Sequence, residues 1–267
     1  MISELNLLID HIKTKTPFVF TKFGDGEYEC ATTVYGGKNC DGDAFTNELS
    51  SKLRRSISIL AMNSSYIGQW FEPHKVLYWE RLVLDTTLIP IRWFHYHTFI
   101  VDGSEEEIRK KVELYSLIRS DKRYKLLIRN VLLDRSSLLL SVDESLEIPL
   151  DNWFTTDYVR VKRRCEELIT EYGGDLIIIG MGGMGIKCLY SDILESYGNL
   201  VTLIDVGSGL DLLSSKRDSR GVTSYEVMVS RFCSLLSSIP EWDSSEQDKR
   251  YGHIYTESRV RLGKHLN

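Results

Sequence analysis

Residues 175–187 read DLIIIGMGGMGIK, and this stretch carries the clearest structural signal in the chain. The β-branched run at 175–179 predicts a buried strand, and the periodicity of Ile186–Tyr197 predicts a helix. The glycines between them match G-x-G-x-x-G, a pattern that lets the backbone approach a phosphate at the start of a helix. A strand, a glycine-rich turn and a helix in this order form the repeating unit of a parallel α/β sheet.

Outward from this unit, the chain alternates between the same two kinds of element. Apolar spacing predicts helices over residues 3–13, 44–62, 104–120, 156–172 and 225–237. Short apolar runs predict strands over residues 18–23, 87–91, 94–101, 125–133, 138–142 and 200–205. Because strands and helices alternate, we expect a Rossmann-like α/β fold with a mostly parallel sheet flanked by helices.

The composition is that of an ordinary folded enzyme domain. The 267 residues are 42% hydrophobic and 27% charged, which is enough to bury a large core. Without repeats or an obvious linker, we expect one domain over residues 1–267, with a polar tail from about residue 241 at its periphery. The formal net charge of −5 argues against a nucleic-acid partner.

Cysteine usage and hydropathy indicate where such a protein works. The five cysteines are scattered and contain no C-x-x-C pair, which favours a reduced, cytoplasmic setting. The N-terminal segment carries Glu4, Asp10 and Lys13 among its apolar residues, unlike the continuous apolar core of a signal peptide. No later run reaches the length of uncharged apolar sequence that a membrane span needs, so we expect no integral membrane segment.

A polar cluster follows the predicted strand 18–23, where residues 22–27 read KFGDGE. Ligands of α/β proteins bind at the carboxyl ends of strands, and the two glycines would allow a close approach. Asp25 and Glu27 could hold Mg²⁺ or Mn²⁺, which prefer oxygen ligands and can neutralise a diphosphate leaving group. The alternative is a solvated turn, because Asp and Gly are common turn residues.

The glycine loop at 180–185 has more than one interpretation. Together with Asp205 downstream it is similar to a dinucleotide fingerprint, which would make the chain an NAD- or S-adenosylmethionine-dependent Rossmann enzyme. Only about 60 residues follow Asp205, however, so a mononucleotide-sized site fits the remaining length better. A tight turn that only packs a helix on the sheet is the structural alternative.

Taken together, these motifs resemble those of glycosyltransferases with the GT-D fold, whose domain was catalogued as DUF1792. The matching segments occur in the same order over roughly 200 residues, which is more specific than any one motif. They are Phe20–Glu27, Asn39–Gly42, Asn152–Trp153, the glycine loop with Lys187, and Ile204–Ser208 with Asp211.

The resemblance implies a transferase that moves a sugar from a nucleotide-sugar donor, usually a UDP-sugar, to a hydroxyl of a glycan acceptor, as in polysaccharide biosynthesis. Asp25 and Glu27 fit its D-x-E pair, which serves Mn²⁺ or Mg²⁺ and the diphosphate. Lys22 stands where arginine is common and keeps the charge without the bidentate fork. Ser208 stands where some relatives carry histidine, which leaves the subgroup and the donor sugar open.

The candidate donor-binding residues come from three predicted loops: Lys22, Gly24, Gly26, Gly180, Gly182, Gly183, Gly185, Lys187, Asp205, Gly207 and Ser208. Asp41 is the first candidate for the base that takes the proton of the acceptor hydroxyl, with a polar turn as its alternative. His95 and His97 alternate along a predicted strand, where they could bind a ligand from one face or be structural.

The tryptophans offer flat surfaces for a base or a sugar ring, or for core packing: Trp70, Trp79, Trp93, Trp153 and Trp242. A nucleotide-sugar donor and a glycan acceptor are the expected partners, and a homodimer is a further expectation. A sugar-nucleotide-binding module without turnover remains an alternative to the enzyme.

Overall fold

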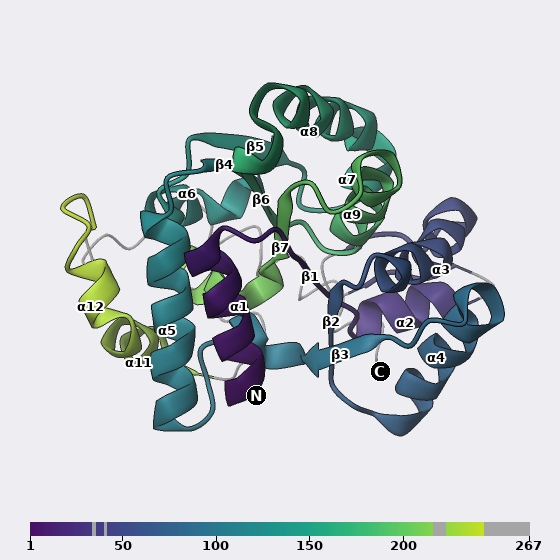
Figure 1. Cartoon of the computed structure of the whole chain (residues 1–267), viewed down its shortest axis with the longest axis horizontal. Coiled ribbons are helices and arrows are strands. Elements are labelled where there is room, and N and C mark those ends of the chain that lie inside the picture. The colour runs from purple at the N-terminus through teal and green to yellow at the C-terminus, as the bar shows by residue number, and fades with distance from the viewer. Residues whose placement is uncertain (34–35, 40–41, 216–222, 243–267) are drawn as a thin grey trace.

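The computed structural model describes residues 1–33, 36–39, 42–215 and 223–242. Their strands form one seven-stranded sheet in which every pairing is parallel, in the order β3-β2-β1-β7-β6-β4-β5 (Figure 1). The strands are β1 Val19–Lys22, β2 Tyr66–Gln69, β3 Arg92–His95, β4 Tyr124–Asn130, β5 Glu144–Ile148, β6 Leu176–Met181 and β7 Thr202–Asp205. The predicted α/β fold with its parallel sheet is confirmed.

Helices flank this sheet on both faces. The longer helices are α1 Ile2–Thr14, α2 Asp25–Thr32, α3 Asn47–Met62, α4 Pro73–Thr87, α5 Glu105–Ser120, α8 Tyr158–Tyr172 and α9 Met184–Tyr197. The shorter ones are α6 Arg135–Leu140, α7 Trp153–Thr156, α10 Asp211–Ser215, α11 Tyr225–Arg231, α12 Cys233–Leu236 and the 3₁₀ helices η1 Tyr96–Phe99, η2 Val131–Leu133, η3 Gly173–Asp175 and η4 Gly207–Leu210. In the described ranges, no helix is both long and apolar enough to cross a bilayer.

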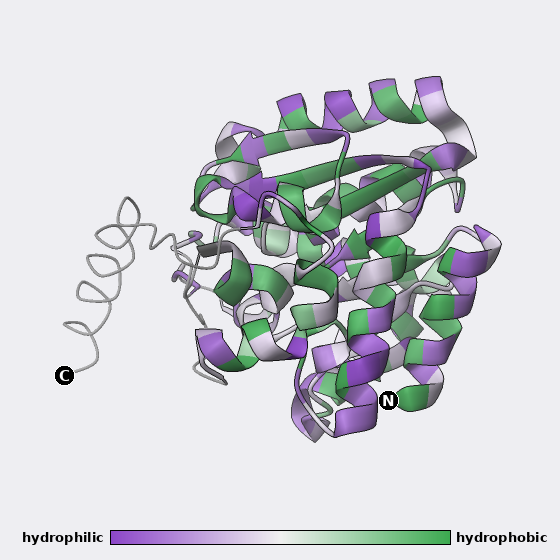
Figure 2. Ribbon diagram, turned by 90° about the vertical axis from the view of Figure 1, so that its left-hand side faces the viewer, coloured by the Kyte–Doolittle hydropathy of each residue, from purple (hydrophilic) through white to green (hydrophobic). Residues whose placement is uncertain are grey.

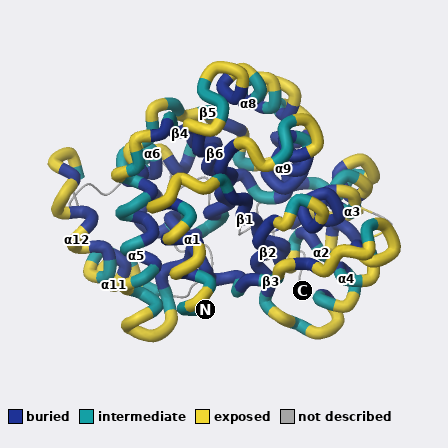
Figure 3. Tube along the Cα trace, viewed as in Figure 1, coloured by how far each residue is buried: buried dark blue, intermediate teal, exposed yellow. Residues whose placement is uncertain are grey.

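The inner strands are buried because both faces of the sheet are covered, whereas the edge strands β3 and β5 are partly exposed (Figure 3). Alternate side chains of β6 enter different clusters: Ile178 packs with α3, α8 and α9, whereas Ile177 and Ile179 pack with α1 and α5. Figure 2 shows the consequence in the hydropathy of the ribbon, with hydrophobic strands inside and helices that carry hydrophilic residues around them. This explains why the central strand β6 reads as a continuous apolar run rather than an alternating one.

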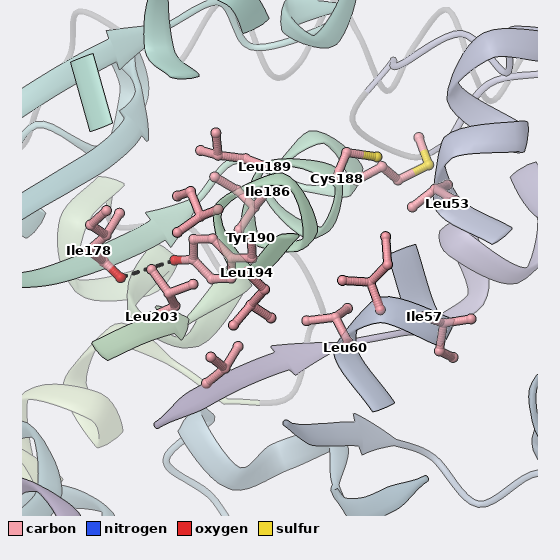
Figure 4. Close-up of a cluster of buried hydrophobic side chains, with 14 of the residues drawn as sticks. Leu53, Ile57, Leu60, Ile178, Ile186, Cys188, Leu189, Tyr190, Leu194 and Leu203 are labelled. Carbon is pink, nitrogen blue, oxygen red and sulfur yellow. Dashed lines mark hydrogen bonds between the residues drawn. The ribbon is translucent and has the colours of Figure 1, made fainter. Parts of the chain in front are cut away.

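The cluster beneath α9 holds the glycine loop in place (Figure 4). Leu53, Ile57 and Leu60 of α3 face apolar residues of α9, and each buried side chain contributes about 1.5–3 kcal/mol through its removal from water. The hydroxyl of the fully buried Tyr190 on α9 donates a hydrogen bond to the carbonyl oxygen of Ile178, with 3.1 Å between the two oxygen atoms. The cluster therefore holds α9 against β6.

Three strand predictions are wrong. Leu138–Val142 overlaps α6, which begins after the cap residue Asp134, and the strand starts only at Glu144. Residues 87–91 belong to the end of α4 and the connection after it. Of the predicted strand 94–101, only the beginning is extended, because the chain turns into η1 after His95.

The two histidines of that segment are also corrected. His97 lies in η1, and its backbone N–H donates to Nδ1 of His95 at 3.2 Å, so the two side chains do not share one face of a strand. Two predicted features fall outside the described residues: Asp41 and most of the tail that was expected from residue 241.

The strand order places a ligand-binding position between β1 and β7. From β1 the chain adds β2 and β3 on one side, whereas β4 to β7 lie on the other side and end next to β1. Connections that diverge in this way open a crevice at the carboxyl ends of the two neighbouring strands, where α/β proteins bind their ligands.

Candidate active site

A cavity of about 210 Å³ lies at the carboxyl ends of β1, β6 and β7. It brings together nine of the residues predicted for the site: Lys22, Asp25, Gly26, Glu27, Gly182, Gly183, Lys187, Gly207 and Ser208. Four other predicted residues are buried and do not line the cavity, although they belong to the same three segments: Gly24, Gly180, Gly185 and Asp205. Three loops that are distant in sequence therefore converge on one site.

The two carboxylates after β1 lie in the first turn of α2, not in a loop. Gly24 is the N-cap residue, and its N–H donates to Oε2 of Glu27 at 2.8 Å, as in a capping box. Residues two positions apart on a helix point in different directions. Glu27 is accordingly directed inward with 10% of its side chain exposed, whereas Asp25 is 63% exposed and its Oδ1 pairs with Lys75 at 2.5 Å.

Lys187 is the electrostatic centre of the cavity. Its Nζ lies 3.1 Å from Oε1 of Glu27 and 2.9 Å from Oδ2 of Asp205, and it donates to the Gly183 carbonyl at 3.0 Å. Burial by itself lowers the pKa of Lys187. The negative charges of Asp205 and Glu27 raise this pKa by more than burial lowers it, so the net shift is upward. The ammonium therefore stays charged at neutral pH and joins the ends of β1, β6 and β7.

Asp205 acts from behind the cavity. It is fully buried, and its Oδ2 accepts hydrogen bonds from the backbone N–H of Lys22 at 3.1 Å and from Oγ1 of Thr21 at 3.2 Å. The ammonium of Lys22 donates in turn to the Val206 carbonyl at 2.9 Å. These bonds tie β1 to β7 and hold Lys187, so Asp205 supports the site from outside its lining.

The glycine loop divides into residues that line the cavity and residues that serve packing. Gly182 and Gly183 line it, and Gly183 is the N-cap of α9 with φ +59, a conformation that favours glycine. The first N–H groups of α9 therefore point toward a position that attracts anions. Gly180 lies within β6, and a Cβ on Gly185 would come within 2.4 Å of Trp153, so these two glycines allow close packing.

A loop that the resemblance included closes another side. Asp43, which lines the cavity, accepts hydrogen bonds from Nδ2 of Asn39 at 3.1 Å and from the backbone N–H of Asn152 at 2.6 Å. Asn152 also accepts one from the N–H of Ala44 at 2.8 Å. Asn39 and Asn152 thus fix the loop.

An aromatic pair completes the lining, and no sequence pattern singled it out. Trp70 follows β2 and Tyr96 follows β3, and their rings stack with centroids 4.8 Å apart and an interplanar angle of 19°. Tyr96 lies against Gly24, where a Cβ would come within 2.9 Å of the ring. The ammonium of Lys22 lies 5.0 Å from the Tyr96 centroid. Trp70 was only one of several tryptophans suited to stacking.

The charged residues of the lining are two lysines and four carboxylates: Lys22, Lys187, Asp25, Glu27, Asp43 and Asp211. A diphosphate would meet an excess of negative charge here unless a cation accompanied it. Mg²⁺ is typically held by one or two carboxylates together with substrate phosphates, and the lining contains two carboxylates of this type after β1, the exposed Asp25 and the inward-directed Glu27. Across the described ranges, no three His, Cys, Asp or Glu side chains group as a closed metal site.

No protein-family model and no curated protein matches the sequence. Solved structures with a similar fold include a selenomethionine-substituted domain of unknown function 1792 (DUF1792), with a TM-score of 0.54 and 16% identity over 91% of each chain. A DUF1792 domain described as having a distinct glycosyltransferase fold gives a TM-score of 0.55 at 15% identity, over 85% of this chain and 87% of that one.

A third structure, described as a new glycosyltransferase (DUF1792) from Streptococcus sanguinis, gives a TM-score of 0.53 at 16% identity, over 78% of this chain and 82% of that one. The likeness extends along most of the chain. The chain therefore has the fold of the DUF1792 domains, a distinct glycosyltransferase fold.

Proposed function

We propose that this chain is a metal-assisted glycosyltransferase that moves a sugar from a nucleotide-sugar donor, a UDP-sugar, to a hydroxyl of a glycan acceptor. The observation that carries the proposal is the buried Lys187, which holds Glu27 and Asp205 at the point where two helices begin. Such a centre, on a glycosyltransferase fold, is suited to a substrate that carries a diphosphate.

The diphosphate would lie at the centre of the cavity. The N-terminus of α9 presents backbone N–H groups and the positive end of its dipole there, and the ammonium groups of Lys22 and Lys187 lie beside it. These groups are fixed by the hydrogen bonds described above before any ligand arrives. Because they need not reorganise, they can stabilise the charge that develops on the leaving UDP.

Asp25 and Glu27 would hold the Mn²⁺ or Mg²⁺. Asp25 pairs with Lys75 through Oδ1, and each oxygen of Glu27 has a second lone pair beside the one that faces Gly24 or Lys187. When bound, the cation would supply further charge neutralisation for the diphosphate. In the transfer, the acceptor hydroxyl oxygen bonds to the anomeric carbon while the bond to the diphosphate breaks. Asp41 stays our candidate for the base that takes the hydroxyl proton.

The setting we propose is a cytoplasmic enzyme of polysaccharide biosynthesis that works as a homodimer. The cysteines within the described ranges support the reduced setting, since Cys30, Cys165, Cys188 and Cys233 are all free.

Thermal-shift measurements with UDP, UDP-sugars, NAD and S-adenosylmethionine, each with and without Mn²⁺, test the proposal. UDP or a UDP-sugar at a hundred times its Kd should add about 2.7 kcal/mol of stability, and only when Mn²⁺ is present. Asp25→Asn should abolish the metal-dependent part. Asp85→Asn, the same change at an exposed position of α4, should keep it. Stabilisation by NAD or S-adenosylmethionine alone would contradict the proposal.

A further inference from the structure

The cavity has a different chemical character at each end. Its centre carries the lysines and helix N-termini described above, and its β4–β5 end is lined by Leu133, Ile148 and Leu150. Its opposite end, beyond β1, is formed by Trp70 and Tyr96. A donor whose diphosphate lies at the centre would extend toward both ends. The two ends therefore have to accommodate different parts of the substrates.

The aromatic end is a stack with one ring at its side. His97 has its centroid 4.3 Å from that of Trp70 and 6.1 Å from that of Tyr96. If His97 covered the face of Trp70 that points away from Tyr96, its distance from Tyr96 would be close to the sum of the Trp70–Tyr96 and Trp70–His97 distances. The observed distance is much shorter, so His97 lies beside the stack. Trp70 is half-buried and lines the cavity.

Buried charges hold this stack from behind. Nδ1 of His97 forms a hydrogen bond with Oδ2 of Asp102, and the ammonium of Lys111 lies 2.9 Å from Oδ1 of the same carboxylate. Lys111 has no exposed side-chain surface. Because Asp102 is hydrogen-bonded on both oxygens, the His97 ring is fixed, and with it the edge of Trp70.

The backbone at Trp70 is equally constrained. The N–H of Trp70 donates to Oε1 of Gln69 at 2.8 Å, and Phe71 has φ +61, a left-handed conformation that is unusual for a bulky residue. Residues held in such conformations cluster at ligand sites, where the surrounding structure determines them. Trp70 is therefore oriented before a ligand binds.

Charged groups lie beside the aromatic end, whereas the β4–β5 end combines its apolar residues with the uncharged amide of Asn130. Lys75 of α4 pairs with Asp25 at 2.5 Å and with Glu72 at 2.9 Å, beside the loop that carries Trp70. A sugar ring has apolar C–H faces and hydroxyls around its edge, so it needs a flat aromatic surface with charged groups near it. A uracil base is flat and carries its polar atoms at its edge, so its two faces can pack on the apolar side chains of Leu133, Ile148 and Leu150.

We propose that Trp70, stacked on Tyr96, is the platform on which a sugar ring of the substrates lies, and that the base binds at the β4–β5 end. This inference rests on the proposed function. The ring belongs either to the donor or to the acceptor, and the shared chemistry is a pyranose face against an indole.

The test uses the full chain with Trp70→Ala, Trp70→Phe and, as a matched control, Trp93→Ala. Trp93 is a half-buried tryptophan on β3 that donates to Glu80 at 3.0 Å and lies outside the cavity lining. Calorimetry with Mn²⁺ gives the Kd of UDP and of UDP-glucose, UDP-galactose and UDP-N-acetylglucosamine. Transfer to the p-nitrophenyl glycosides of the same sugars gives kcat and KM, and circular dichroism confirms that each variant is folded.

Trp70→Ala should leave the Kd of UDP unchanged. It should raise about tenfold either the Kd of the UDP-sugar or the KM of the glycoside acceptor. A weaker Kd for the UDP-sugar alone assigns the ring to the donor, and a higher KM for the glycoside alone assigns it to the acceptor. Trp70→Phe should recover part of the loss, and Trp93→Ala should behave as the wild type.

Equal weakening of UDP and UDP-sugars by Trp70→Ala would place the base on Trp70 and overturn the proposal. So would a Trp70→Ala protein that matches the wild type in every constant. A wild-type protein that binds neither UDP nor any UDP-sugar contradicts the proposed function itself, and it is recognised before any variant is compared.

Discussion

Replacement of Lys187 by methionine should destabilise the protein more than the loss of any exposed ion pair. Methionine keeps most of the apolar stem but removes the ammonium from between Glu27 and Asp205, whose side chains are 10% and 0% exposed. Both carboxylates would then stay buried without their cation. Removal of one partner from a buried ion pair costs about 3–5 kcal/mol. In a protein of this size that lowers Tm by roughly 10 °C.

Urea denaturation at pH 7.5, followed by circular dichroism, measures the difference in unfolding free energy between Lys187→Met and the wild type. Lys162→Met is the matched control. Lys162 is 31% exposed and lies 3.0 Å from Asp192, which keeps a second partner in Lys52 at 2.8 Å, so we expect a loss below about 1 kcal/mol. If Lys187→Met is also within 1 kcal/mol of the wild type, Lys187 is not the cation that compensates the two buried carboxylates.

Three further predictions concern the walls of the cavity and the core. Gly24→Ala would place a Cβ within 2.9 Å of the Tyr96 ring and should cost about 1–3 kcal/mol in a thermal melt; an unchanged Tm would contradict the close contact. Asn152→Ala loses the hydrogen bond from the Ala44 N–H and places alanine at φ +55. We therefore expect the free energy of unfolding, measured by urea denaturation, to fall by about 2 kcal/mol, and an unchanged value would show that Asn152 does not hold the loop. Burial raises the pKa of Cys188 to about 12, so an alkylating reagent at pH 7.5 should modify the exposed Cys233 first; peptide mass spectrometry that finds Cys188 equally modified would refute this.

The sequence predicted those parts of the fold whose signal is local. The run from Asp175 to Gly185 combines β-branched residues, glycines and helical spacing, and the structure has β6 and α9 there. The leucines at 138–140 could not be assigned in the same way, because a short apolar run is compatible with a strand or with a helix. The cap at Asp134 and the packing of α6 decide it.

The candidate site was predictable only as separate loops. Glu27 and Lys187 were each identified from their own motifs, but their ion pair depends on β1 and β6 lying on either side of β7. Trp70 was not distinguished from the other tryptophans, because β2 is only four residues long and contains Gly68, so neither the strand nor the loop after it was recognised.

Release of UDP from UDP-sugars by the purified wild-type protein tests the central claim most directly. With glycoside acceptors and Mn²⁺ at neutral pH, we expect at least one UDP-sugar to yield UDP and a glycosylated product. EDTA should abolish the reaction, added Mn²⁺ should restore it, and Asp25→Asn should be inactive although it is folded. Absence of UDP release from every UDP-sugar, or a rate that neither EDTA nor Asp25→Asn changes, would contradict the account.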